Sequence, residues 1–231
     1  MYSGRNLCDA RSRLMPAVFT LVLATSNQGK LAELRSLLQD LPIELVSYTD
    51  VLGEKRSLPE DGDTLEANAI QKARAVCHLT ALCSLADDSG LEVDALAGRP
   101  GVRSARFAHE RATDAENNAA LLRAMEEVEE GARAARFRCV LALASPWDSE
   151  VRVSEGRCEG SISRTPRGSG GFGYDPLFVV SEAGGRAMAE LTEEEKNAIS
   201  HRGRAVLAMR AVLLDVINAR LDEAERVSGG Y

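Results

Sequence analysis

Short apolar runs and stretches with helical spacing alternate along the first part of the chain. Residues 18–25 form an apolar run rich in β-branched side chains, which predicts a buried strand. Leucines then recur at helical spacing over residues 29–41, and residues 43–49 predict a second strand. A strand, a helix and a further strand in this order are typical of an α/β fold.

The same pattern of apolar and polar positions predicts the remaining elements. Residues 61–80 predict a helix that Asp63 or Thr64 can cap, and residues 81–87 a third strand that ends at two aspartates. The later elements are a helix at 114–128, a hairpin of strands at 135–146 and 150–162, a strand at 176–180, and one or two helices at 192–221 that Gly203 can break. We therefore expect a mixed sheet flanked by helices, in a single domain over residues 17–225.

The N-terminus loosely resembles a secretion signal, because Arg5, Arg11 and Arg13 precede the apolar residues 14–24. However, the run leads directly into a polar segment without a small-residue cleavage site, and it is too short to span a bilayer. We expect residues 1–16 to be a disordered extension, with Met15 as an alternative start.

Composition narrows the classes of partner. The chain has 231 residues, of which 45% are hydrophobic and 27% charged, as in ordinary globular proteins. Its net charge of -7 argues against binding to a nucleic-acid backbone, and nothing suggests a membrane partner. The five cysteines are scattered without C-x-x-C spacing, which favours reduced thiols in a cytoplasm over zinc or disulfides.

Residues 25–30, "TSNQGK", lie between the first strand and the first helix. Small residues let the backbone approach a ligand, the helix N-terminus offers free N–H groups, and Lys30 adds a positive charge. The segment therefore predicts a polyphosphate-binding loop, although it lacks the glycine and GK[ST] positions of a Walker A motif. A capped helix with a solvated lysine is the simpler alternative.

Adjacent carboxylates at Asp87 and Asp88 repel each other, which suggests that a cation lies between them. Ligands of open α/β sheets collect at the carboxyl ends of strands, so this pair and residues 25–30 are expected in one crevice. Carboxylate oxygens there suit Mg²⁺ that also carries phosphates, and Glu60 in the preceding polar loop can reach the same place. Taken alone, Asp88 is better explained as a turn residue and Glu60 as a solvated loop charge.

Two later segments add candidate residues. Residues 167–176, "RGSGGFGYDP", match G-x-G-x-x-G but are followed by a strand, so we reject a dinucleotide motif and expect a close-fitting wall. Phe172 in this wall could stack on a base, whereas Tyr174 is expected in the core. Residues 200–205, "SHRGRA", group donors at a helix start, one turn after Lys196.

Together these segments resemble the inosine triphosphate pyrophosphatases, or Ham1-like family. The matching stretches are "LATSNQGKLAEL", "EANAIQKAR", "LADDSGLEVDALAGRPGVRSARFA", "GSGGFGYDPLF" and "ELTEEEKNAISHRGRA", in family order over about residues 18–210. The resemblance implies a long bent sheet with two lobes and a central nucleotide cleft. It further implies Mg²⁺-dependent hydrolysis of dITP, ITP and XTP to the monophosphate and pyrophosphate, usually by a homodimer.

The resemblance also implies roles for individual residues. Asp88 is the expected proton acceptor and a metal ligand, and Glu60 is a weaker metal match. Asp87 is the third expected metal ligand, on the argument from adjacent carboxylates given above. The expected substrate-binding residues are Thr25, Ser26, Asn27, Gln28, Gly29, Lys30, Lys72, Ser89, Phe172, Gly173, Tyr174, Asp175, Lys196, His201 and Arg202.

Two alternatives stay open. A Maf-type pyrophosphatase would act on other nucleotides, and the "SHRG" segment argues against it. A non-catalytic module would bind purine triphosphates without hydrolysis, and Asp88 together with Lys72 favours catalysis instead.

Overall fold

The computed structural model describes residues 18–228, so the expectation for residues 1–16 lies outside the described residues. Six strands form one sheet: β1 (Phe19–Leu23), β2 (Ile43–Ser47), β3 (Cys83–Val93), β4 (Ala134–Ser145), β5 (Asp148–Ile162) and β6 (Phe178–Val180). Their order across the sheet is β2-β1-β3-β4-β5-β6. Strand β1 pairs in parallel with β2 and β3, and the other neighbours are antiparallel, which confirms a mixed sheet.

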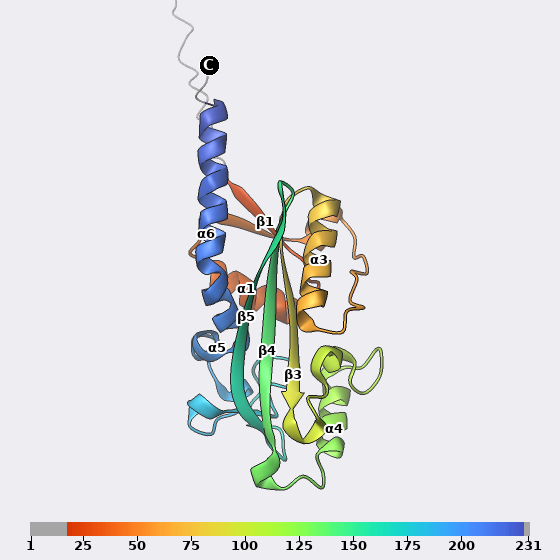
Figure 1. Ribbon diagram of the computed structural model, residues 1–231. Coiled ribbons are helices and arrows are strands. Elements are labelled where there is room, and N and C mark those ends of the chain that lie inside the picture. The colour runs from red at the N-terminus through yellow and green to blue at the C-terminus, as the bar shows by residue number, and fades with distance from the viewer. Residues whose placement is uncertain (1–17, 229–231) are drawn as a thin grey trace, which may run out of the picture.

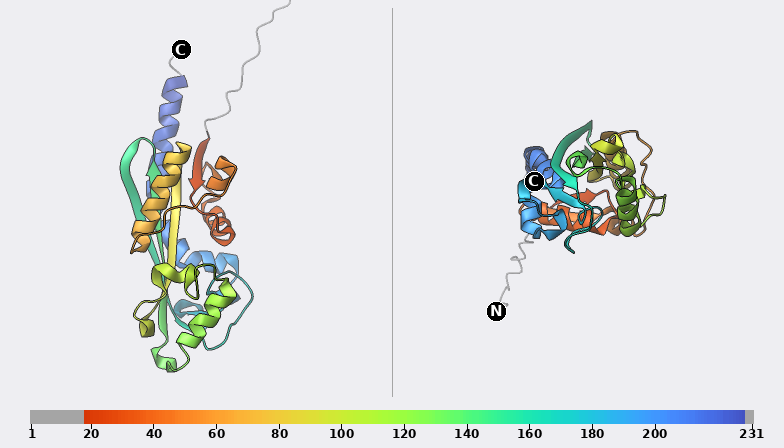
Figure 2. Two further views of the ribbon diagram at one scale, coloured as in Figure 1. Left: turned by 90° about the vertical axis from the view of Figure 1, so that its right-hand side faces the viewer. Right: turned by 90° about the horizontal axis from the view of Figure 1, so that it is seen from below.

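Helices lie on both faces of this sheet. They are α1 (Gln28–Leu38), α2 (Tyr48–Leu52), α3 (Leu65–Thr80), α4 (Asp114–Ala124), α5 (Glu193–Ile199) and α6 (His201–Ser228), with short 3₁₀ turns at Asp94–Leu96, Gly101–Arg106, Glu130–Ala132, Ser181–Ala183 and Met188–Glu190. Helix α3 covers one face, and α1 and α6 cover the other (Figures 1 and 2). This arrangement confirms the α/β fold class.

The strand alternation divides the apolar side chains between two core layers. Leu21 and Leu141 face α1 and α6, whereas Val22 and Val140 face α3. A third cluster, around Phe178, fills the lower half of the molecule. The long strands β3, β4 and β5 run through both halves and so connect the two lobes (Figure 1).

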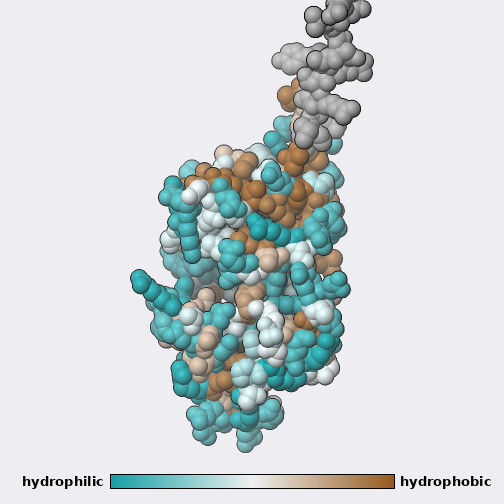
Figure 3. Space-filling view, turned by 180° about the vertical axis from the view of Figure 1, so that it is seen from behind, coloured by the Kyte–Doolittle hydropathy of each residue, from teal (hydrophilic) through white to brown (hydrophobic). Residues whose placement is uncertain are grey.

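The edges of the sheet are short strands. On the back of the molecule, hydrophobic residues gather at the upper end (Figure 3). The edge strand β2 leaves Ile43, Leu45 and Val46 only half-buried.

Within residues 18–228, no helix has the length and apolar character that crossing a bilayer requires.

Strand β3 differs most from the sequence prediction. It does not end at the aspartate pair but continues to Val93, and Asp87 and Asp88 pair with Leu141 and Val140 of β4. Polar and small residues at 87–90 favour a turn locally, yet the ladder with β4 and the cations described below keep them extended. The predicted end of this strand at the aspartate pair is therefore wrong.

Two helix boundaries also differ. The predicted strand over 43–49 ends at Ser47, because Ser47 caps the short helix α2 by accepting a hydrogen bond from the Asp50 N–H. The break between α5 and α6 lies at Ser200, which has an extended backbone and whose Oγ accepts from the Gly203 N–H at 3.0 Å. Gly203 lies inside α6 instead, where a Cβ would overlap the carbonyl oxygen of Asn197.

We predict that Gly156→Ala destabilises the protein by about 1–3 kcal/mol, because a Cβ at this position of β5 would overlap the His201 carbonyl and the Ala205 amide of α6. Thermal unfolding measures the effect. Gly131→Ala is the matched control, since a Cβ there meets no atom within 4 Å. Equal melting temperatures for the two variants would contradict this account of how α6 packs on β5.

Candidate active site

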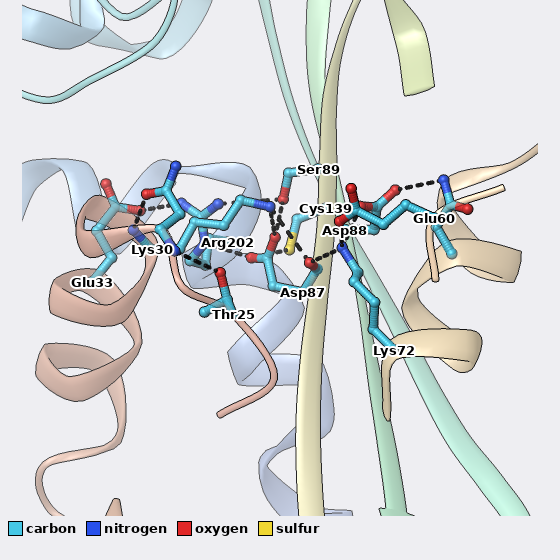
Figure 4. Close-up of polar contacts among 12 residues, drawn as sticks. Thr25, Lys30, Glu33, Glu60, Lys72, Asp87, Asp88, Ser89, Cys139 and Arg202 are labelled. Carbon is cyan, nitrogen blue, oxygen red and sulfur yellow. Dashed lines mark hydrogen bonds and ion pairs between the residues drawn. The ribbon is translucent and has the colours of Figure 1, made fainter. Parts of the chain in front are cut away.

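The site is organised by the alternation of side chains along β3. Successive residues of a strand point to opposite faces of the sheet. Asp87 points toward α1 and α6, whereas Asp88 points toward α3 (Figure 4). Each carboxylate therefore has its own set of cationic partners.

Asp87 is the centre of a buried ion-pair cluster. Its Oδ1 accepts from Lys30 Nζ at 2.5 Å and from Ser89 Oγ at 2.7 Å. Its Oδ2 accepts from Arg202 Nε at 2.6 Å and from the Cys139 thiol at 3.3 Å. Burial alone would raise the pKa of Asp87, but Arg202 and Lys30 outweigh it and hold that pKa well below its usual range.

Asp88 lies in a second cluster on the α3 side. Lys72 Nζ donates to Asp88 Oδ1 at 2.6 Å, to Glu60 Oε1 at 2.9 Å and to the Asp87 carbonyl at 2.9 Å. Asn68 Nδ2 donates to Asp88 Oδ2 at 3.3 Å. Burial alone would lower the pKa of Lys72, but the charges of Asp88 and Glu60 outweigh it and raise that pKa. Burial likewise would raise the pKa of Glu60, but Lys72, with smaller contributions from Lys30 and Arg106, lowers it.

The two carboxylate clusters differ in whether they could hold a metal ion. Within residues 18–228, no three His, Cys, Asp or Glu side chains form a cluster that could hold a metal alone. Mg²⁺ at nucleotide sites is commonly held by one or two carboxylates together with phosphates and water. Glu60 and Asp88, which share Lys72 and line one cavity, provide such a pair and fit Mg²⁺.

Asp87 does not fit this role. Its side chain is fully buried on the other face of β3, and cations and donors already occupy its oxygens. The expectation that one divalent cation holds both aspartates together is therefore wrong. Lys30 and Arg202 compensate Asp87, and Lys72 compensates Asp88.

The predicted phosphate loop forms a capped helix start. Asn27 caps α1, with its Oδ1 accepting from the Lys30 N–H at 3.0 Å, and the Asn27 N–H donates to Thr25 Oγ1 at 3.2 Å. Thr25 and Ser26 line the cavity ahead of the helix. Because α1 begins here, its first N–H groups and its positive dipole end face this part of the cavity.

The glycine-rich segment brings Phe172 against the start of α1. A Cβ at Gly29 would overlap the Phe172 ring, so only glycine permits this contact. Lys196 Nζ lies 4.9 Å from the ring centroid, and the Asp175 carboxylate accepts both from Lys196 Nζ at 2.5 Å and from the Phe172 N–H at 3.0 Å. Tyr174 is buried and donates its hydroxyl to the Ser104 carbonyl, so it is a core residue as expected.

Glu33 is a site residue that sequence reasoning missed. It lies on α1, one turn after Lys30, and its side chain is mostly buried. It pairs with Lys196 Nζ at 2.6 Å and with the Arg202 guanidinium. An acidic residue between the buried Leu31 and Leu34 was the available signal, because a buried carboxylate requires a cationic partner.

His201 occupies the first position of α6 and stacks on Phe137, with ring centroids 4.7 Å apart and planes 14° apart. Burial, followed by the charge of Arg202, lowers its pKa well below the usual range, so the ring is neutral at pH 7. Its Nδ1 is buried without a hydrogen-bond partner among the residues described. Arg202, in contrast, already bonds to Asp87, Glu33 and Ser89.

These side chains surround one cavity of about 400 Å³. Lys30, Lys72 and Asp88 line it together with Phe172 and His201, so segments from both lobes contribute. Of the predicted site residues, only Gln28, Gly29 and Asp87 do not line it. Further lining residues that the sequence reading did not name include Tyr48, Lys55, Arg56, Ser104, Arg106 and Asp114.

The sequence model of the Ham1 family matches residues 21–212, nearly all of this fold. The chain belongs to the Ham1 family. A relative named dITP/XTP pyrophosphatase, from Geobacter sulfurreducens, is 51% identical over 190 residues, covering 82% of this chain and 94% of the relative. Another of that name, from Escherichia coli K12, is 50% identical over 198 residues, covering 85% and 97%.

A solved structure gives the same result for the fold. The HAM1 protein from Coxiella burnetii superposes with a TM-score of 0.77 at 44% identity, covering 86% of this chain and all of that one. The Ham1 architecture expected from the motifs is thereby confirmed.

We predict that the stability of this Ham1 chain falls as pH falls from about 6.5, because the unfolded His201 then binds a proton that the buried ring does not. The slope is at most about 1.4 kcal/mol per pH unit. Melting temperatures between about pH 5 and pH 7 measure it, and His201→Asn should flatten the slope. His78→Asn, at an exposed position, should leave it unchanged, and equal slopes in all three proteins would contradict the assignment.

Proposed function

We propose that this chain hydrolyses dITP, XTP and ITP to the monophosphate and pyrophosphate, with Mg²⁺, and so removes non-standard purines from the nucleotide pool. The names of its half-identical relatives support this activity. The observation that carries the proposal is the single cavity in which the α1 start and Lys72 face the Glu60–Asp88 pair, with Phe172 and His201 also in its lining.

The charges in the cavity suit a triphosphate even though the whole chain is acidic. Lys30, Lys72, Arg106 and the N-terminus of α1 place positive charge around the site. Such an arrangement attracts a polyanion locally and stabilises negative charge that develops on a leaving pyrophosphate.

Asp88 is the proposed general base. A water molecule attacks the α-phosphorus, Asp88 accepts its proton, and the bond from the α-phosphorus to the bridging oxygen breaks as pyrophosphate leaves. Lys72 orients the Asp88 carboxylate by donating from its Nζ to Asp88 Oδ1 at 2.6 Å. Mg²⁺ bound at Glu60 and Asp88 would neutralise phosphate charge and acidify bound water.

The base end of the cavity accounts for selectivity. Hypoxanthine and xanthine present a 6-oxo acceptor where adenine presents an amino donor. Donors from His201, Arg202 or backbone N–H groups would leave adenine with unpaired donors, which can discriminate by up to about 10⁴-fold. The Phe172 ring, which is half-buried and lines the cavity, suits a purine ring.

Two further expectations belong to the proposal. A homodimer follows from the family resemblance, and sedimentation would test it. A cytoplasmic location agrees with the buried free thiols at Cys77, Cys83, Cys139 and Cys158.

A substrate panel tests the function. With Mg²⁺ present, we expect kcat/KM for dITP and XTP to exceed that for dATP by at least about 10²-fold, with pyrophosphate rather than orthophosphate released. Separate assays for the two products distinguish the outcomes. Comparable turnover of dTTP would favour a Maf-type enzyme, and tight ITP binding without pyrophosphate release would favour a non-catalytic module.

We predict that Asp88→Asn lowers kcat for dITP by about 10²-fold or more while KM changes little, since the amide keeps the shape but cannot accept the proton. Steady-state kinetics measure both. Asp63→Asn is the control, because that exposed carboxylate lies before α3 and does not line the cavity. Near-normal turnover of the Asp88 variant would show that another group is the base.

A further inference from the structure

Both backbone polar groups of Gly173 are bound by one helix. The Gly173 N–H donates to Asp114 Oδ2 at 2.7 Å, and its carbonyl accepts from Asn118 Nδ2 at 2.9 Å. Asp114 and Asn118 lie one turn apart on α4, so they form a clamp on a single residue of the glycine-rich segment. Helix α4 belongs to the lower lobe, away from α1 (Figure 1).

The backbone of Gly173, the residue held by this clamp, adopts a conformation that favours glycine. Gly173 has a φ of +62°, in the left-handed region, and a Cβ would meet no atom within 4 Å. Glycine is therefore needed for its backbone angle rather than for space. A left-handed residue directly after Phe172 sets the direction in which the Phe172 backbone and ring approach the cavity.

Asn118 is poorly explained by stability alone. Its Oδ1 is buried and has no hydrogen-bond partner within the described part of the chain, which destabilises the folded state. The amide cannot be reversed without turning this oxygen toward the Gly173 carbonyl. Asn118 also does not line the cavity, so any effect on a ligand must act through Gly173.

Phe172 is thus held from several sides. The Phe172 N–H donates to Asp175, the ring packs against Gly29 and lies near Lys196, and Gly173 is fixed by α4. Without the clamp, the backbone N–H and carbonyl of Gly173 would each lose their side-chain partner, and the ring position would become less defined.

We propose that Asp114 and Asn118 are positioning residues that hold Phe172 in place to stack on the purine. This role rests on the proposed function, since it assigns the Phe172 face to the base. Stacking on an aromatic side chain contributes binding that is already present in the ground state, so its loss raises KM and leaves kcat nearly unchanged.

The test uses the full-length chain and two kinds of variant. Asn118→Leu removes the donor together with the unpartnered oxygen, and we expect KM for dITP to rise about 3- to 10-fold with kcat within about twofold. Its melting temperature should change little, because removal of the unpartnered oxygen offsets loss of the hydrogen bond to the Gly173 carbonyl. Inhibition by pyrophosphate should be unchanged, because pyrophosphate occupies the phosphate end.

The second kind of variant tests the other half of the clamp. Asp114→Ala should raise KM similarly, and Asp114→Asn should restore it, because the amide oxygen still accepts from the Gly173 N–H. Glu116→Ala is the matched control: it removes the Glu116 side chain that accepts from the Thr113 N–H in the capping box of α4, without touching Gly173, so it should lower stability and leave KM unchanged.

Several results would overturn the proposal. These are unchanged KM in Asn118→Leu and Asp114→Ala, an equal rise in Glu116→Ala, or pyrophosphate inhibition that weakens in parallel with KM. If the wild-type chain does not hydrolyse dITP, the proposed function fails, and hydrogen exchange decides the clamp separately. The Gly173 amide should exchange faster in Asp114→Ala and Asn118→Leu than in wild type, and equal rates would refute the clamp.

Discussion

The alternation of side chains along β3 is the constraint on which the site depends. Two neighbouring carboxylates cannot share one face of a strand, so Asp87 and Asp88 are separated by the sheet itself. Asp87 then requires cations from α1 and α6, and Asp88 requires one from α3. One short segment of backbone thereby fixes the position of three helices relative to the cavity.

The two clusters have different chemical roles because they differ in exposure. The Asp87 side chain is 0% exposed and its partners leave it no free oxygen for a ligand, so it serves to orient Lys30 and Arg202. The Asp88 side chain is 12% exposed and borders the cavity, where a metal or water can reach it. Buried ion pairs are weak contributors to net stability but strong determinants of geometry, which is what a site for a flexible triphosphate requires.

Local patterns were sufficient to predict most elements, since apolar periodicity and capping residues act over a few positions. The phosphate loop and the "SHRG" segment were also accessible, because a helix start and its neighbouring cations are local features. The extension of β3 was not, because it depends on pairing with β4 and on Arg202, 115 positions away. Glu33 was missed for a similar reason: helical spacing places it on the buried face but does not identify Lys196 and Arg202 as its partners.

The chain of contacts Lys196–Glu33–Arg202–Asp87–Lys30 limits how this site can diverge. Replacing one member removes one of the opposite charges that compensate its buried neighbours, and breaking a buried ion pair typically destabilises a protein by up to about 3–5 kcal/mol. A single substitution of this kind would therefore remove much of the net free energy of unfolding of a domain. Evolutionary change here must therefore proceed through compensatory exchanges of neighbours, and a sequence that alters one of the five should alter another.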